Sequence, residues 1–160
     1  MSESVPSIPS SQHDPAVAGT KARRSLLPAA RSALDSARWY LRTAHQAPDP
    51  STRFLHAHFA ALRAAAAVVA QCGHRTRRKR QRPRSVWELL PEAEPSLDGW
   101  ALRFSASAAQ RPAVEAGLPS ALNPGAATEL MNDATTFLAV VEDVLRSSVS
   151  VPDGSVEHGA

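Results

Sequence analysis

Apolar residues recur at spacings of three and four along most of the chain, which is the pattern of helices that bury one face. Four long segments show this pattern. They are residues 25–46, 49–73, 95–114 and 123–147. No alternation typical of strands and no internal repeat accompanies them. The pattern therefore predicts four amphipathic helices on short connections, which favours an up-down bundle.

Each predicted helix carries apolar residues that we expect to face the core. They are Leu27, Ala30, Leu34, Ala37, Leu41 and Ala44; then Leu55, Phe59, Leu62, Ala66 and Val69; then Leu97, Trp100, Ala101, Phe104, Ala108 and Val114; and finally Leu130, Met131, Ala134, Phe137, Leu138, Val141, Val144 and Leu145. The many alanines of the second helix should give it smooth sides that neighbouring helices can approach closely. Trp39, Trp87 and Trp100 are expected to anchor the core or its edge.

Residues with known preferences for helix ends mark the boundaries of the predicted helices. The start signals are Asp49 or Ser51 with Pro50 for the second helix, Ser85 with Glu88 for a short extra helix through Leu90, and Asn123-Pro124 for the fourth helix. Gly73 is suited to close the second helix. The predicted fold class is all-α: an up-down four-helix bundle with one short extra helix.

Length and composition are consistent with one helical domain. The chain has 160 residues, is rich in alanine and contains 5% aromatic residues. We expect a disordered N-terminal tail over residues 1–24, the bundle over 25–147, and a disordered C-terminal tail over 148–160.

A single cysteine, Cys72, excludes an intrachain disulfide and favours a reducing compartment. With no signal peptide and no membrane-spanning run in the sequence, we expect a soluble cytoplasmic protein and no membrane partner.

One segment holds most of the positive charge. Residues 75–84, called the basic segment below, read RTRRKRQRPR; they contain seven Lys or Arg and no acid. The candidate nucleic-acid-binding residues are Arg75, Arg77, Arg78, Lys79, Arg80, Arg82 and Arg84. Unpaired charges are too costly to bury, so these side chains are either solvated, as in a protease-sensitive linker, or neutralised by phosphates. The segment contains no aromatic residue, so we expect low sequence specificity.

The remaining charge is unevenly divided along the chain. Residues 21–63 hold eight basic and two acidic residues, whereas residues 85–160 hold three basic and eleven acidic ones. The sequence therefore predicts a bundle with one positive and one negative half.

Arg53 and His58 are the candidate catalytic residues. Arginine can hold a phosphate, and histidine can transfer a proton near neutral pH, which together suit metal-independent RNA cleavage. The alternative for His58 is a histidine at the flank of the bundle that bonds to a neighbour. Arg38 and His45 form a second such pair, and Arg38 has the alternative of extending over the core edge. His56 and His58 lie about 200° apart around a helix and cannot bind one metal ion together, so we expect no metal site and no cofactor.

Several of these segments resemble a family of small actinobacterial HEPN domains, the higher eukaryotes and prokaryotes nucleotide-binding superfamily. Arg53, Phe54, Ala57 and His58 match its Arg-aromatic-x-x-Ala-His element before an alanine-rich helix. The basic segment follows, and then Trp87-Glu88-Leu89-Leu90 match its Trp-Glu-Leu-Leu element. The similarity spans roughly residues 25–146. It implies a HEPN-like four-helix bundle.

The resemblance implies a function connected with RNA. Ribonucleases of the superfamily use Arg, four to six residues and then His in a cleft shared by two protomers, and the Arg53–His58 and Arg38–His45 spacings agree with this. The leading hypothesis is an RNA-associated protein acting as a homodimer, with metal-independent ribonuclease activity through Arg53 and His58. Two alternatives stay open: a non-catalytic interaction module that binds a protein or nucleic acid, and a DNA-associated adaptor.

Overall fold

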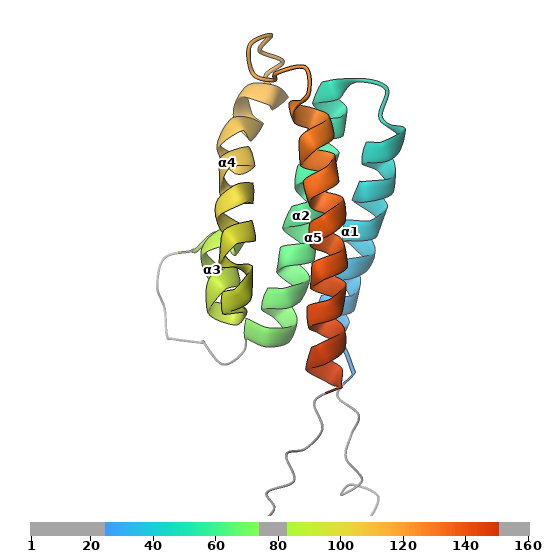
Figure 1. Cartoon of the computed structure of the whole chain (residues 1–160), viewed down its shortest axis with the longest axis vertical. Coiled ribbons are helices and arrows are strands. Elements are labelled where there is room, and N and C mark those ends of the chain that lie inside the picture. Colours follow the sequence, from blue (N-terminus) through green and yellow to red (C-terminus); the bar gives the residue numbers. More distant parts are fainter. Residues whose placement is uncertain (1–24, 74–82, 151–160) are drawn as a thin grey trace, which may run out of the picture.

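The computed structural model describes residues 25–73 and 83–150, and these ranges contain helices and no strand. The elements are α1 (Pro28–Gln46), α2 (Pro50–Cys72), α3 (Val86–Ala93), the 3₁₀ turn η3 (Pro95–Leu97), α4 (Asp98–Glu115) and α5 (Ala126–Val149). The four long helices alternate in direction, and α1 starts at the same end of the bundle at which α5 finishes (Figure 1). The predicted up-down four-helix bundle with one short extra helix is confirmed.

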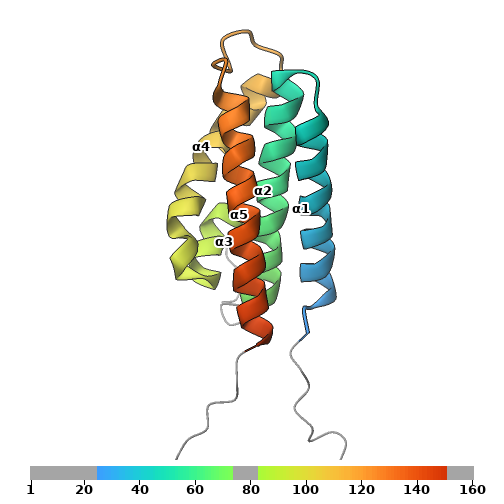
Figure 2. The same cartoon turned by 45° about the vertical axis from the view of Figure 1, so that its right-hand side comes forward.

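The second helix is the centre of the bundle. It contacts α1, α3, α4 and α5, whereas the main contacts of α1 are with α2 and α5. Figure 2 shows α1 and α4 on opposite sides of α2, with α5 in front of it. One face of α2, which carries the exposed Arg63 and the half-buried His56 and Phe59, is only partly covered by the other helices, and we call it the open face.

Aromatic rings fill the space between α3, α4 and α5. Phe104 lies 5.3 Å from Trp87, 6.0 Å from Trp100 and 5.0 Å from Phe137, measured between ring centroids. Phe104 and Phe137 have no exposed surface. Bulky rings thus hold α4 against α5, whereas alanines mediate the closer contact of α1 with α2.

The core-facing side of α2 differs from the prediction. Five residues of α2 were expected to face the core, but each is only half-buried. They are Leu55, Phe59, Leu62, Ala66 and Val69. The buried side instead contains Phe54, Ala57, His58, Ala60, Ala61, Ala64, Ala65, Ala67, Val68 and Gln71. Small side chains allow helix backbones to approach closely, so the alanine face packs inward and the bulkier stripe is displaced outward.

The predicted start of α2 and the predicted capping box are confirmed. The Asp49 carboxylate accepts a hydrogen bond of 2.8 Å from the Thr52 backbone N–H, and Ser85 and Glu88 form both bonds of the capping box. The predicted cap of the last helix is wrong. Gly125 occupies the N-cap of α5 without a side-chain bond, and Asn123 contributes only its backbone carbonyl, which accepts from the Ala126 N–H.

Two further contacts define the ends of the helices. The buried Gln71 side chain accepts a hydrogen bond of 2.8 Å from the Leu27 N–H, which ties the start of α1 to the end of α2. At the end of α4, Gly117 has φ +70°, and the N–H groups of Gly117 and Leu118 donate to Val114 and Ala113. This arrangement is a Schellman motif, in which glycine avoids the strain of the left-handed conformation.

Within the described ranges, only α2 is long and apolar enough to cross a membrane, and half of the relevant window is buried inside the bundle. Core helices commonly pass the same test, so this feature is weak support for a membrane span.

Candidate functional site

His58 lies in the core between α2, α3 and α4. Its side chain is 1% exposed, and its Nδ1 is 3.0 Å from the Ser107 hydroxyl oxygen. The Ser107 hydroxyl donates its only proton to the Phe104 carbonyl oxygen at 2.8 Å. Nδ1 of His58 must therefore carry the proton and donate it to Ser107. The structure places His58 as a hydrogen-bonded histidine within the helical packing.

The surroundings of His58 keep its ring neutral. Burial of the ring lowers its pKa from 6.5 to about 4, and the positive charge of Arg111 acts in the same direction. The carboxylate of Glu115 opposes the shift. Near neutral pH the ring is thus an uncharged packing residue with Trp87 and Phe59 as ring neighbours.

Arg53 does not approach His58. Its guanidinium donates a hydrogen bond of 3.1 Å to the Ala47 carbonyl oxygen in the α1–α2 connection. Five residues correspond to about 140° around a helix, so the two side chains leave α2 in different directions. Within one chain, the structure therefore does not bring the two candidate catalytic residues together.

The second pair, Arg38 and His45, lies on one side of α1. Arg38 donates to Glu142 of α5 at 3.2 Å and contacts Asp35 at 3.4 Å, while His45 is exposed. Arg38 thus joins α1 to α5 through an ion pair.

Most of the basic segment lies outside the described residues, namely Arg75, Arg77, Arg78, Lys79, Arg80 and Arg82. Arg84 is described, and its guanidinium forms a bidentate ion pair with the Glu92 carboxylate, in which Nη1 lies 3.1 Å from Oε2. A paired arginine is a poorer phosphate ligand than a free one, because Glu92 must first be displaced. We therefore assign Arg84 to the α3 contact and retain the other six cations as candidates.

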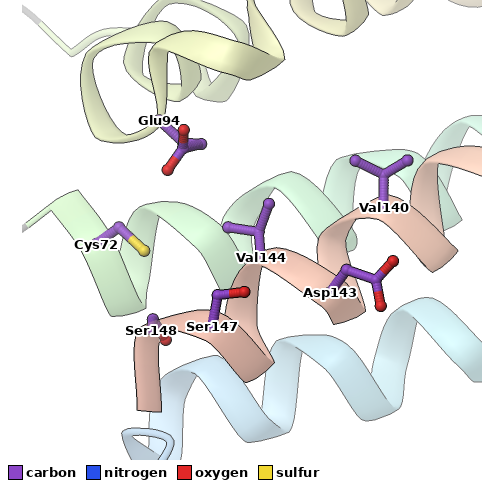
Figure 3. A pocket seen from close by; sticks show the side chains of 7 residues that line it. All are labelled: Cys72, Glu94, Val140, Asp143, Val144, Ser147 and Ser148. Carbon is purple, nitrogen blue, oxygen red and sulfur yellow. The ribbon is translucent and has the colours of Figure 1, made fainter. Parts of the chain in front are cut away.

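An open pocket of about 500 Å³ lies beside the ends of α2 and α5 (Figure 3). It is lined by Cys72, Glu94, Val140, Asp143, Val144, Ser147 and Ser148. Burial raises the pKa of the Cys72 thiol, and the nearby Glu94 carboxylate raises it further. The thiol is therefore protonated near neutral pH, and the pocket does not suit cysteine nucleophilic catalysis.

The open face of α2 and the adjacent side of α1 carry a set of aromatic rings that the sequence analysis missed. Trp39 was expected to anchor the core or its edge, but it is 54% exposed, and its ring is 5.0 Å from Tyr40 and 6.4 Å from His56. Tyr40 lies 5.4 Å from Phe59. We call Trp39, Tyr40, His56 and Phe59 the aromatic surface cluster. The adjacent Trp39-Tyr40 pair was the available signal, but only packing shows that its rings continue onto α2.

The described residues contain no group of three or more His, Cys, Asp or Glu arranged to hold a metal ion.

No curated protein and no solved structure matches the chain significantly. The model of the SAV_6107-like HEPN family, in contrast, matches residues 44–142. This range covers more than half of the chain and extends from the end of α1 into α5, including α2 with Arg53 and His58. The chain therefore belongs to the SAV_6107-like HEPN family.

Proposed function

We propose that this protein binds RNA and acts as a non-catalytic HEPN domain. Membership of the HEPN family suggests a nucleotide-related or RNase-like function. The observation that carries the non-catalytic assignment is the burial of His58, because a base that is 1% exposed and bonded to Ser107 cannot reach a ribose hydroxyl. The orientation of Arg53 toward the Ala47 carbonyl supports the same assignment.

The basic segment supports the RNA-binding part of the proposal. Six of its cations lie between Gly73 at the end of α2 and Pro83 before α3, with no acid among them. Each phosphate contact on a single strand contributes about −0.7 to the slope of log affinity against log salt. Five contacts would therefore give a slope of about −3.5. Contacts of this kind follow the backbone, so we expect weak dependence on RNA sequence.

The test is incubation of the full chain with cellular RNA in EDTA, followed by a mobility-shift titration at several salt concentrations. We expect intact RNA and a shift that weakens steeply with salt. The matched variant replaces the cations at positions 75, 77, 78, 79, 80 and 82 with glutamine and keeps Arg84, which holds Glu92. This variant should lose most of the affinity and the salt dependence.

Three results would contradict the proposal. Cleavage to 2′,3′-cyclic phosphate ends that disappears in Arg53→Ala and in a folded His58→Gln variant would establish the ribonuclease interpretation. An absence of any shift at low salt would exclude RNA binding, and a strong preference for duplex DNA would favour the DNA-associated adaptor.

A homodimer is a second proposal, favoured by the family, since HEPN domains often dimerise. Leu102, in the second turn of α4, is 68% exposed, and we place this side chain in the contact. We expect sedimentation equilibrium to show a dimer at micromolar concentration and Leu102→Gln to shift it toward monomer. A wild-type protein that stays monomeric at the highest concentration would refute this proposal without affecting RNA binding.

A further inference from the structure

We propose that the aromatic surface cluster is a base-stacking site for single-stranded RNA, separate from the basic segment. The proposal rests on the RNA-binding function proposed above and adds a second point of contact to it. The basic segment contains no aromatic residue on which a base could stack. The cluster supplies the missing rings from α1 and α2.

The rings form a continuous surface across two helices. Tyr40 lies 6.0 Å from His56 and 5.4 Å from Phe59, and Trp39 packs edge-on against Tyr40 at 5.0 Å. The inner members are half-buried, so the packing of α1 on α2 fixes their positions. Trp39 is the outermost ring, with 54% of its surface exposed. A ring held in this way can accept a base without losing much side-chain freedom.

Two arginines accompany the rings. The Arg111 guanidinium of α4 lies over Phe59, with its central carbon 5.0 Å from the ring centroid. Arg84 binds Glu92 through both terminal guanidinium nitrogens, whereas Arg111 donates to Glu115 through Nε alone, at 2.9 Å. The two terminal nitrogens of Arg111 can therefore approach a phosphate while Nε stays bound, although Glu115 reduces the net positive charge there. Arg63 is exposed and follows Phe59 by one turn on the same side of α2. Cations beside an exposed ring, here Trp39, are the combination that binds single-stranded nucleic acid, in which phosphates and unstacked bases are both accessible.

The charge of this face favours RNA over a second copy of the chain. A twofold contact with its axis at the cluster would bring the exposed Arg63 side chains of the two copies close together, and like charges in a contact are unfavourable. Leu102, assigned above to a dimer contact, lies nine residues before Arg111, which is half a turn around α4. It therefore points away from the cluster, so both surfaces can be occupied at once.

The cluster and the end of α2, after which the basic segment follows in the sequence, are far enough apart to contact different nucleotides. Phe59 and the end of α2 at Cys72 are separated by 13 residues, or about 20 Å along the helix axis. A single strand of about 12 nucleotides is within the usual range of such binding sites and is suited to reach both.

The test compares a 12-nucleotide oligo(U) with an abasic oligomer of the same length and charge, using the full chain and fluorescence anisotropy. We expect the wild type to bind oligo(U) more tightly. Trp39→Ala should raise the Kd for oligo(U) about 5- to 100-fold, toward the value for the abasic strand, with the salt slope unchanged. Trp39→Phe should recover part of the affinity. Leu118→Ala is the matched control, because Leu118 has the same exposed fraction as Trp39.

The outcomes separate this site from the function on which it rests. Equal affinity of the wild type for both strands, or no effect of Trp39→Ala, would overturn the stacking site and leave RNA binding through the basic segment intact. Failure of the wild type to bind either strand would overturn both proposals. A dimer that dissociates in Trp39→Ala while affinity for oligo(U) stays the same would assign the cluster to a second copy instead.

Discussion

Replacement of His58 by alanine is expected to lower the free energy of unfolding by about 3 kcal/mol at pH 7.5. The ring is 1% exposed, so its removal leaves a cavity beside Trp87 and Phe59 and deletes the hydrogen bond to Ser107. Removal of a histidine that served only catalysis would change the free energy of unfolding little. Urea denaturation followed by circular dichroism measures the difference, and His45→Ala, at an exposed position of α1, is the control with an expected change below about 0.5 kcal/mol.

The same residue should make the wild type less stable in acid. The pKa of His58 is lowered from 6.5 to about 4 in the folded protein by burial and by the charge of Arg111, while Glu115 opposes the shift. As pH falls below 6.5, the unfolded chain takes up the proton first, so the free energy of unfolding declines. Between pH 7.5 and pH 5 the loss from this group is about 2 kcal/mol.

Denaturation curves at pH 7.5, 6 and 5 test this titration. The His58→Gln variant removes the group and should show about 2 kcal/mol less decline over this range than the wild type. An equal decline in both proteins would contradict the buried, neutral state of His58. It would also weaken the argument that His58 has no catalytic role.

The second large effect is expected for Phe104→Ala, which should lower the free energy of unfolding by about 4 kcal/mol. Phe104 has no exposed surface and contacts Trp87, Trp100 and Phe137. These rings hold α3 and α4 against α5, so the cavity would lie between these three helices. Collapse of the helices around it is hindered by the size of the neighbouring rings.

Thermal unfolding and urea titration both measure this change. Gln110→Ala, six residues later in α4 and exposed, is the control and should change stability by less than about 0.5 kcal/mol. A loss below about 1.5 kcal/mol for Phe104→Ala would show that the aromatic contacts are not the main support of α4.

Both residues were named in the sequence analysis, but for different reasons. Phe104 was expected in the core from the spacing of apolar residues on its helix, and the structure confirms this. His58 was singled out for its chemistry. Spacing placed it near the apolar stripe of α2, but that stripe was assigned to the wrong side of the helix. Because the alanine side of α2 faces inward, His58 lies in the core and not at the flank of the bundle.

The sequence by itself determined the helical class, the approximate helix boundaries and the up-down order. These depend on local signals, such as the Asp49 cap, the Ser85–Glu88 capping box and the apolar spacing of α4 and α5. Only the tertiary structure decided which side of α2 is buried, because both of its sides are apolar and the choice depends on how closely the backbones of α1 and α2 can approach. The same packing placed His58 in the core and left Trp39 exposed beside Tyr40, His56 and Phe59, contacts between residues that spacing along one helix cannot relate.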